Sequence, residues 1–114
     1  MTDPNGRAPK FEVVPERDGT VATLIVRGEL DIATTPKLEA GFAGLEAGYE
    51  TLVVDLTECT FFASSGISLL LEHNARCTEA GIEMAIVKAP PDVQRMFDLL
   101  ALDERLTFIE RPAA

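Results

Sequence analysis

The sequence predicts a single α/β domain with a mixed sheet and helices packed on that sheet, because three features occur together. Short apolar runs alternate with amphipathic helical stripes, which is the pattern of a partly parallel sheet with crossover helices. The pair Asp18-Gly19 between two apolar runs predicts an antiparallel hairpin at the N-terminal end. The run from Leu52 to Leu56 is almost continuously apolar, as expected of a central strand buried on both faces.

Length, charge and composition exclude several classes of protein. The chain has 114 residues, which suits one domain and leaves no room for two independent cores. Its net charge of −9 argues against direct nucleic-acid binding and against attraction to an acidic membrane. No apolar run is long enough to span a membrane or to form a signal peptide, so we expect a cytoplasmic protein. Two cysteines and one histidine predict no metal site and no cofactor.

The elements are expected in the order β-β-α-β-α-β-α-β. We expect residues 11–110 to form the domain, with flexible tails at 1–10 and 111–114. The hairpin joins a strand at 11–14, closed by the proline that follows it, to a strand at 21–26 that ends at the next glycine.

The middle of the chain predicts two helices on either side of the central strand. Thr35 is the expected N-cap of the first helix, with Pro36 as its first residue. A loop at 57–64 follows the central strand and leads to the strongest helix, which Gly81 ends. One side of the first helix carries Leu38, Phe42 and Leu45, and one side of the second carries Ile67, Leu70, Leu71, Asn74 and Thr78.

The last third of the chain repeats the alternation of strand and helix. A strand is expected at 84–87 and a final strand at 106–109. Pro90-Pro91 opens the helix between them, whose apolar face consists of Val93, Met96, Phe97 and Leu100.

The most informative segment is Ser64-Ser65-Gly66, which we expect at the start of the second helix. A serine there can cap the helix by accepting a hydrogen bond from its free N–H groups. The same helix end tolerates an attached phosphate, because its N–H groups and dipole favour negative charge. A capping serine is common in proteins, so the structural and the functional interpretation both stay open.

Two further features extend this candidate site. Phe61 and Phe62 are adjacent, so they point to opposite sides and only one readily enters the core; the other is exposed beside the serines and suits a contact surface. If the second and third strands are parallel neighbours, the loop with Asp31 and the loop with Ser64 flank one crevice. Asp31 is expected to act there in binding rather than in folding. Alternatively, the segment is only a polar connection to the next helix.

Catalytic interpretations fail on the residues present, so we expect no enzyme. Phe62 stands where a nucleophile elbow centred on Ser64 needs glycine. The single imidazole, His73, lies about 12 Å or more along the following helix. No Gly-Lys-Ser/Thr phosphate loop occurs. A receiver-type interpretation of Asp55 lacks the acidic pair expected after the first strand.

Gly28-Glu29-Leu30-Asp31, the strand at 52–56 and the segment from Phe61 to Gly66 together resemble the anti-sigma factor antagonists, which are bacterial STAS-domain proteins. Residues 90–102 are similar to the third helix of that family. The resemblance implies a single STAS domain, phosphorylation of Ser64 by an anti-sigma factor serine kinase, and contact between Asp31 and that kinase. The unphosphorylated form would bind the kinase and release the sigma factor in transcription regulation and stress response.

The resemblance also implies a metal-dependent serine phosphatase that reverses the switch. The expected partner-binding residues are Glu29, Asp31, Phe61, Phe62, Ala63, Ser64, Ser65, Gly66 and Ile67. Ala63 departs from the family, which has Asp at this position. The alternative is therefore a STAS module that serves as an interaction or scaffold unit without the phosphate switch.

The two cysteines are not expected to form an intramolecular disulfide. Cys59 is placed before the second helix and Cys77 on the order of 18 Å along it, whereas a disulfide needs Cα atoms within about 7 Å.

Overall fold

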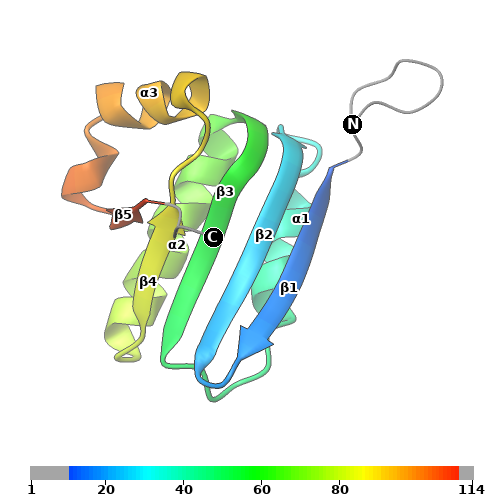
Figure 1. Cartoon of the computed structure of the whole chain (residues 1–114), viewed down its shortest axis with the longest axis vertical. Coiled ribbons are helices and arrows are strands. Elements are labelled where there is room, and N and C mark those ends of the chain that lie inside the picture. The colour runs from blue at the N-terminus through cyan, green and yellow to red at the C-terminus, as the bar shows by residue number, and fades with distance from the viewer. Residues whose placement is uncertain (1–10, 111–114) are drawn as a thin grey trace.

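A five-stranded mixed sheet with strand order β1-β2-β3-β4-β5 organises the protein (Figure 1). The computed structural model describes residues 11–110, and the tails expected at 1–10 and 111–114 lie outside the described residues. The elements are β1 (Glu12–Asp18), β2 (Val21–Leu30), α1 (Thr35–Ala43), β3 (Thr51–Phe62), α2 (Ser64–Glu79), β4 (Glu83–Val87), α3 (Pro91–Leu99), a short 3-10 helix (Leu102–Glu104) and β5 (Phe108–Ile109).

The topology confirms the predicted hairpin and the parallel remainder of the sheet. β1 pairs with β2 in the antiparallel direction, and Gly19 in the turn between them has φ +59°, a left-handed conformation that glycine adopts without strain. β2, β3, β4 and β5 then pair in parallel, joined by the three helices. Each crossover returns the chain to the same end of the sheet, as parallel strands require.

The core lies between the sheet and the helices α1 and α2, which Figure 1 shows on the same face of the sheet. In β2 and β3 buried side chains alternate with half-buried ones, so one face carries most of the core. The central strand is therefore more one-sided than its apolar run predicts. The core contacts come from Leu24, Val54, Leu38, Phe42 and Leu70, all at most 6% exposed.

Three strands are longer than the sequence predicts. β1 continues through Pro15 to Asp18. Proline has no N–H to donate, and an edge strand such as β1 tolerates it because one edge of the strand has no neighbour to pair with. β2 runs past Gly28 to Leu30, and β3 continues to Phe62 through the predicted loop. Bulges explain this extension: the pair Ile25↔Asp55 is followed by Arg27↔Glu58, and Gly28↔Cys59 by Glu29↔Phe61, so β3 holds one extra residue at each step.

The helix starts and the end of α2 agree with the predicted signals to within one residue. α1 begins at Thr35, with Thr34 rather than Thr35 as the N-cap. At the end of α2, Gly81 has φ +74° and its N–H donates to the Thr78 carbonyl at 3.2 Å, while the Ile82 N–H donates to the Cys77 carbonyl at 2.8 Å. This is a Schellman motif, and it confirms Gly81 as the residue that stops the helix. Leu45 and Leu100, predicted on the apolar faces of the first and third helices, lie beyond the ends of α1 and α3. Leu100 is 56% exposed, because the helix stops before the left-handed residue Ala101. The last strand, β5, is shorter than the predicted 106–109.

Candidate functional site

The candidate site lies where β2 and β3 end side by side. Leu30 pairs with Phe62 at the last rung of the parallel ladder, and the Ala63 N–H extends it by donating to the Leu30 carbonyl at 2.8 Å. The turn between β2 and α1 (residues 31–34, the β2–α1 turn) and the first turn of α2 therefore share one end of the sheet. Asp31 and Ser64 thus lie at the same end of the sheet, as the topology predicts, and the crevice expected between their loops stays a prediction.

Ala63, and neither of the serines, is the N-cap of α2. Its backbone is extended, with φ −77° and ψ 161°, and its carbonyl accepts from the N–H groups of Gly66 at 3.0 Å and Ile67 at 3.2 Å. The prediction that Ser64 or Ser65 caps the helix is wrong, because both lie inside its first turn. An alanine methyl accepts no hydrogen bond, so the helix start has no side-chain cap.

Ser64 is the exposed residue of the pair. It is the first residue of α2, and its hydroxyl makes no hydrogen bond to another side chain or backbone group within residues 11–110. Ser65 is half-buried, and its Oγ lies 2.8 Å from Oγ1 of Thr35. The two hydroxyls therefore differ: one faces solvent, and the other joins α2 to the start of α1.

Gly66 allows α2 to approach the ends of both strands. A Cβ at this position would lie 2.1 Å from Cδ2 of Leu30 and 2.8 Å from Cε1 of Phe62, which is closer than nonbonded carbon atoms come. The packing of α2 against Leu30 and Phe62 thus requires glycine at position 66, whatever the function of the site.

Asp31 shapes the β2–α1 turn instead of standing free as a loop acid. Its Oδ1 accepts from the Thr34 N–H at 2.9 Å and lies 3.1 Å from Thr34 Oγ1, while its own N–H donates to Thr34 Oγ1 at 2.9 Å. These bonds from Thr34 hold the pKa of Asp31 below its usual value of 3.8. The expectation that Asp31 has no part in folding is wrong, because its carboxylate organises the local backbone. Its contact with a partner stays a prediction.

The two adjacent phenylalanines separate as predicted. Phe62 is 1% exposed and meets the ring of Phe97 edge to face, with centroids 5.3 Å apart. Phe61 is 47% exposed and lines a hollow of about 230 Å³ between the end of β3 and α3, together with Thr60, Phe62, Asp92, Val93 and Met96. Phe61 can therefore contact a partner, whereas Phe62 supports the site from the core.

The remaining residues predicted for the site fall into two groups. Glu29 is exposed near the end of β2, and Ala63 is half-buried. Gly66 and Ile67 are buried, so they can affect a partner only through packing. The sequence interpretation missed Ile32, which is 82% exposed in the β2–α1 turn. A large aliphatic residue between Asp31 and Thr34, in a segment with no strand or helix period, was the available signal.

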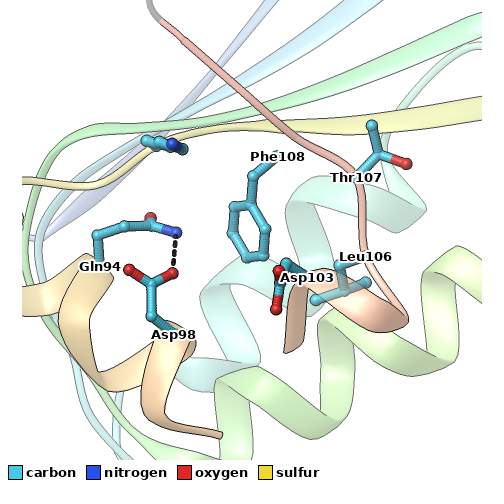
Figure 2. Close-up of a pocket in the computed structure, with 7 residues that line it drawn as sticks. Gln94, Asp98, Asp103, Leu106, Thr107 and Phe108 are labelled. Carbon is cyan, nitrogen blue, oxygen red and sulfur yellow. Dashed lines mark hydrogen bonds between the residues drawn. The ribbon is translucent and has the colours of Figure 1, made fainter. Parts of the chain in front are cut away.

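A second hollow, of about 420 Å³, lies between α3 and β5 and contains none of the predicted site residues. Figure 2 shows Gln94 and Asp98 of α3 on one side of it and Phe108 and Asp103 on the other. Gln94 is 7% exposed; its Oε1 accepts from the Ala89 N–H at 3.1 Å and its Nε2 lies 3.4 Å from Asp98. The buried amide is thus satisfied within the fold.

The histidine and the cysteines occupy structural positions. His73 stacks on Phe42 with ring centroids 3.9 Å apart, and burial is the main cause that lowers the pKa of His73. Cys59 lies in β3, not in a loop, and its Sγ donates to the Phe61 carbonyl at 3.2 Å. Both cysteines are free and buried, and burial raises the pKa of each thiol.

Among residues 11–110, no group of three or more His, Cys, Asp or Glu side chains is placed to hold a metal ion. None of the helices described there is long and apolar enough to cross a membrane.

Comparison with known proteins defines the family. The sequence profile of the family described as "Mlab, STAS domain" matches residues 13–110, which is nearly all of the described chain. The chain therefore belongs to the STAS domain family, as its motifs predict.

One curated relative matches part of the chain. Osmosensory protein A of Mycobacterium tuberculosis is 32% identical over 77 residues, which cover 67% of this chain and 49% of that protein. The chain thus spans about half the length of this curated relative.

Solved structures share the fold. An anti-sigma factor antagonist from Mycobacterium paratuberculosis has a TM-score of 0.77 at 24% identity, covering 97% of this chain and 92% of that one. The anti-sigma factor antagonist SpoIIAA in its unphosphorylated form has a TM-score of 0.65 at 16% identity, covering 90% of both chains. The Bacillus protein SpoIIAA is also similar in its phosphorylated form, with a TM-score of 0.63.

Proposed function

We propose that this STAS domain is a cytoplasmic anti-sigma factor antagonist that works by partner switching. Its unphosphorylated form binds an anti-sigma factor serine kinase and thereby frees a sigma factor. Phosphorylation of Ser64 ends that binding, and a metal-dependent serine phosphatase restores it. The chain itself acts by binding and not by catalysis. The observation that carries the proposal is the exposed Ser64 hydroxyl at the start of α2, at the same end of the sheet as exposed Phe61 and Ile32.

The surface around Ser64 combines apolar contacts with an accessible acceptor. Ile32 and Phe61 offer apolar area to a partner, and contact surfaces obtain most of their binding free energy from a few such side chains. The net charge of −9 favours a basic partner surface.

A phosphate on Ser64 adds a charge of about −1.5 to −2 at neutral pH. In the free domain, the unpaired N–H groups and the dipole of α2 offset part of this charge. In a complex, the phosphate must lose its water next to apolar side chains, and each 1.4 kcal/mol of that cost weakens binding about tenfold. One covalent group therefore releases the partner without unfolding the domain.

The competing function is a scaffold module that binds its partner without a phosphate switch. Ala63 favours this alternative, since the helix start beside Ser64 has no acidic side chain. The two functions differ in whether Ser64 is ever modified, so a phosphorylation assay separates them.

The test uses the purified chain, ATP and an extract of the source cells. We expect a gain of about 80 Da in intact mass for wild type and for Ser68→Ala, a control at an exposed serine of the same helix, and none for Ser64→Ala. The kinase that adds the phosphate is then purified. Ser64→Ala should bind it constitutively, and Ser64→Asp should bind it more weakly. Equal affinity of the two variants contradicts charge gating, and the absence of any modification favours the scaffold function.

A further inference from the structure

We infer that Ser65 is a positioning residue: its hydroxyl, through Thr35, holds the β2–α1 turn against the first turn of α2 and leaves Ser64 as the only phosphate acceptor of the pair. The second half of this inference rests on the proposed function. The first half concerns the fold of the site and stands apart from it.

The direction of the hydroxyl chain follows from a count of protons. The Asp31 backbone carbonyl carries no proton and lies 2.8 Å from Thr35 Oγ1, so the Thr35 hydroxyl donates to it. Thr35 then has only lone pairs left for Ser65, whose Oγ is 2.8 Å away. The Ser65 hydroxyl therefore donates to Thr35, and the sequence of bonds runs from Ser65 through Thr35 to Asp31.

This series of hydrogen bonds ends on Asp31, the residue that organises the β2–α1 turn. The Asp31 carbonyl also accepts from the Thr35 N–H at 3.0 Å, and the Asp31 carboxylate accepts from the Thr34 N–H. Ser65 is thus the residue of α2 that connects the helix to this network, and through it to the turn that displays Ile32. Loss of the Ser65 hydroxyl should loosen the turn while the Ala63 to Leu30 bond keeps the strands and helix together.

The same geometry separates the two serines as acceptors. The Ser65 proton is engaged and its Oγ is half-buried against Thr35, so a phosphate there would have to displace the turn. The Ser64 hydroxyl faces solvent in the first residue of the helix.

A double-mutant cycle tests the positioning role without a partner. The variants are Ser65→Ala, Thr35→Val and the double variant, with Thr35→Ser as the version that keeps a hydroxyl and Ser68→Ala as the control. We expect a coupling of about fivefold in the unfolding equilibrium constant, the size of one net hydrogen bond. Ser65→Ala and Thr35→Val should both shift the amide NMR signals of residues 31–34, and Thr35→Ser should leave them near wild type. Additive effects with unchanged signals would overturn the inference.

Phosphorylation in the cell extract tests acceptor choice. Fragment mass spectra of the wild-type product should place the phosphate on Ser64 alone, and Ser65→Ala should be modified at Ser64 several-fold more slowly, with Ser68→Ala at the wild-type rate. Phosphate on Ser65, or an unchanged rate in Ser65→Ala, contradicts the inference. If neither serine is modified in wild type, the proposed function and the acceptor choice fail together, and the cycle still decides the positioning role.

Discussion

Ala63 illustrates how one side chain sets the character of the candidate site. It occupies the N-cap of α2 in an extended conformation, where Asp, Asn, Ser or Thr would accept an N–H of the first turn. The methyl group provides no acceptor, so the N–H groups of the first turn have no side-chain cap. The first turn of α2 therefore keeps its anion-attracting character, which an acidic cap would partly cancel.

We expect Ala63→Asp to stabilise the domain by about 1 kcal/mol, because the new carboxylate caps α2. The matched control is Ala75→Asp, which makes the same change at an exposed position inside the same helix and should be neutral or destabilising. Urea denaturation of the three proteins measures both effects. A midpoint for Ala63→Asp at or below that of wild type means that the carboxylate does not reach the helix N–H groups.

Gly66 is the second position where one side chain decides the packing. Gly66→Ala should lower the free energy of unfolding by about 1–3 kcal/mol, since the added methyl overlaps Leu30 and Phe62. Denaturation midpoints check this, with Ser68→Ala on the exposed side of α2 as the control. An unchanged midpoint would show that the Leu30 side chain moves aside without cost.

At the level of elements, the sequence predicts which segments form strands and helices better than where they end. The Asp18-Gly19 turn, the Pro36 start and the Gly81 stop are local signals carried by one or two residues, and the structure agrees with each to within a residue. The sequence predicts a loop at 57–64, but the part of this segment from Thr57 to Phe62 belongs to β3. It forms a strand because β2 lies beside it and bulges adjust the register, which depends on a partner distant in sequence.

In the candidate site, too, topology and local sequence patterns predict some features, whereas contacts between distant segments decide the others. Topology predicted that Asp31 and Ser64 share one end of the sheet, and the adjacency of Phe61 and Phe62 predicted that they separate. The roles of Ser65, Thr35 and Asp31 depend on hydrogen bonds between segments, which no local pattern specifies. Ile32 was missed because a single exposed aliphatic residue has no periodicity to reveal it.

The contact between α1 and α2 should make stability decrease as the pH falls below about 6.5, the usual pKa of histidine. His73 of α2 stacks on Phe42 of α1, and burial and Arg76 hold the pKa of His73 below its usual value of 6.5 against the opposing effects of Glu72 and Glu39. The unfolded chain therefore takes up the proton first as the pH falls. Stability should be complete above pH 6.5 and decrease as the pH falls through the interval between the two pKa values.

Thermal melts of wild type and His73→Gln from pH 7.5 to 5.5 measure this dependence. The melting temperature of wild type should fall across the range, and that of the variant should change less, because His73 is the only histidine. The lowered pKa of Asp31 contributes in a separate window, where stability is lost as the pH falls below about 4. Parallel curves for the two proteins would assign the dependence to other groups.

For the whole molecule, exposed large apolar side chains lie at both ends of β2 and β3 and also in and after α3, at Leu99, Leu100 and Ile109. Val21 is the first residue of β2, whereas Ile32 follows the other end of β2 and Phe61 lies at the end of β3, where α2 begins with Ser64. A domain that carries a net charge of −9 repels its own copies, so a small apolar area can remain exposed without driving association. The area is then available to a partner of opposite charge.

We expect Ile32→Ser to weaken binding of the proposed anti-sigma factor kinase about tenfold while the melting temperature stays near wild type, since the side chain is 82% exposed. The control is Val21→Ser, an exposed aliphatic residue at the opposite end of β2, which should bind normally. Calorimetric titration with the purified kinase measures the affinities. Equal losses in both variants would mean that the partner does not use the Ser64 end.

Each of the two bulges of β3 switches which alternate side chains of the strand face the core. Buried side chains fall on even positions at Leu52, Val54 and Leu56, then on the odd position Cys59, and on an even position again at Phe62. The first extra residue inverts which neighbour faces inward, and the second restores it. Without the second inversion, Phe61 would enter the core and Phe62 would face solvent. The number of residues between the bulges and the end of β3 therefore decides which phenylalanine faces outward, and the gain or loss of one residue here would exchange the positions of Phe61 and Phe62.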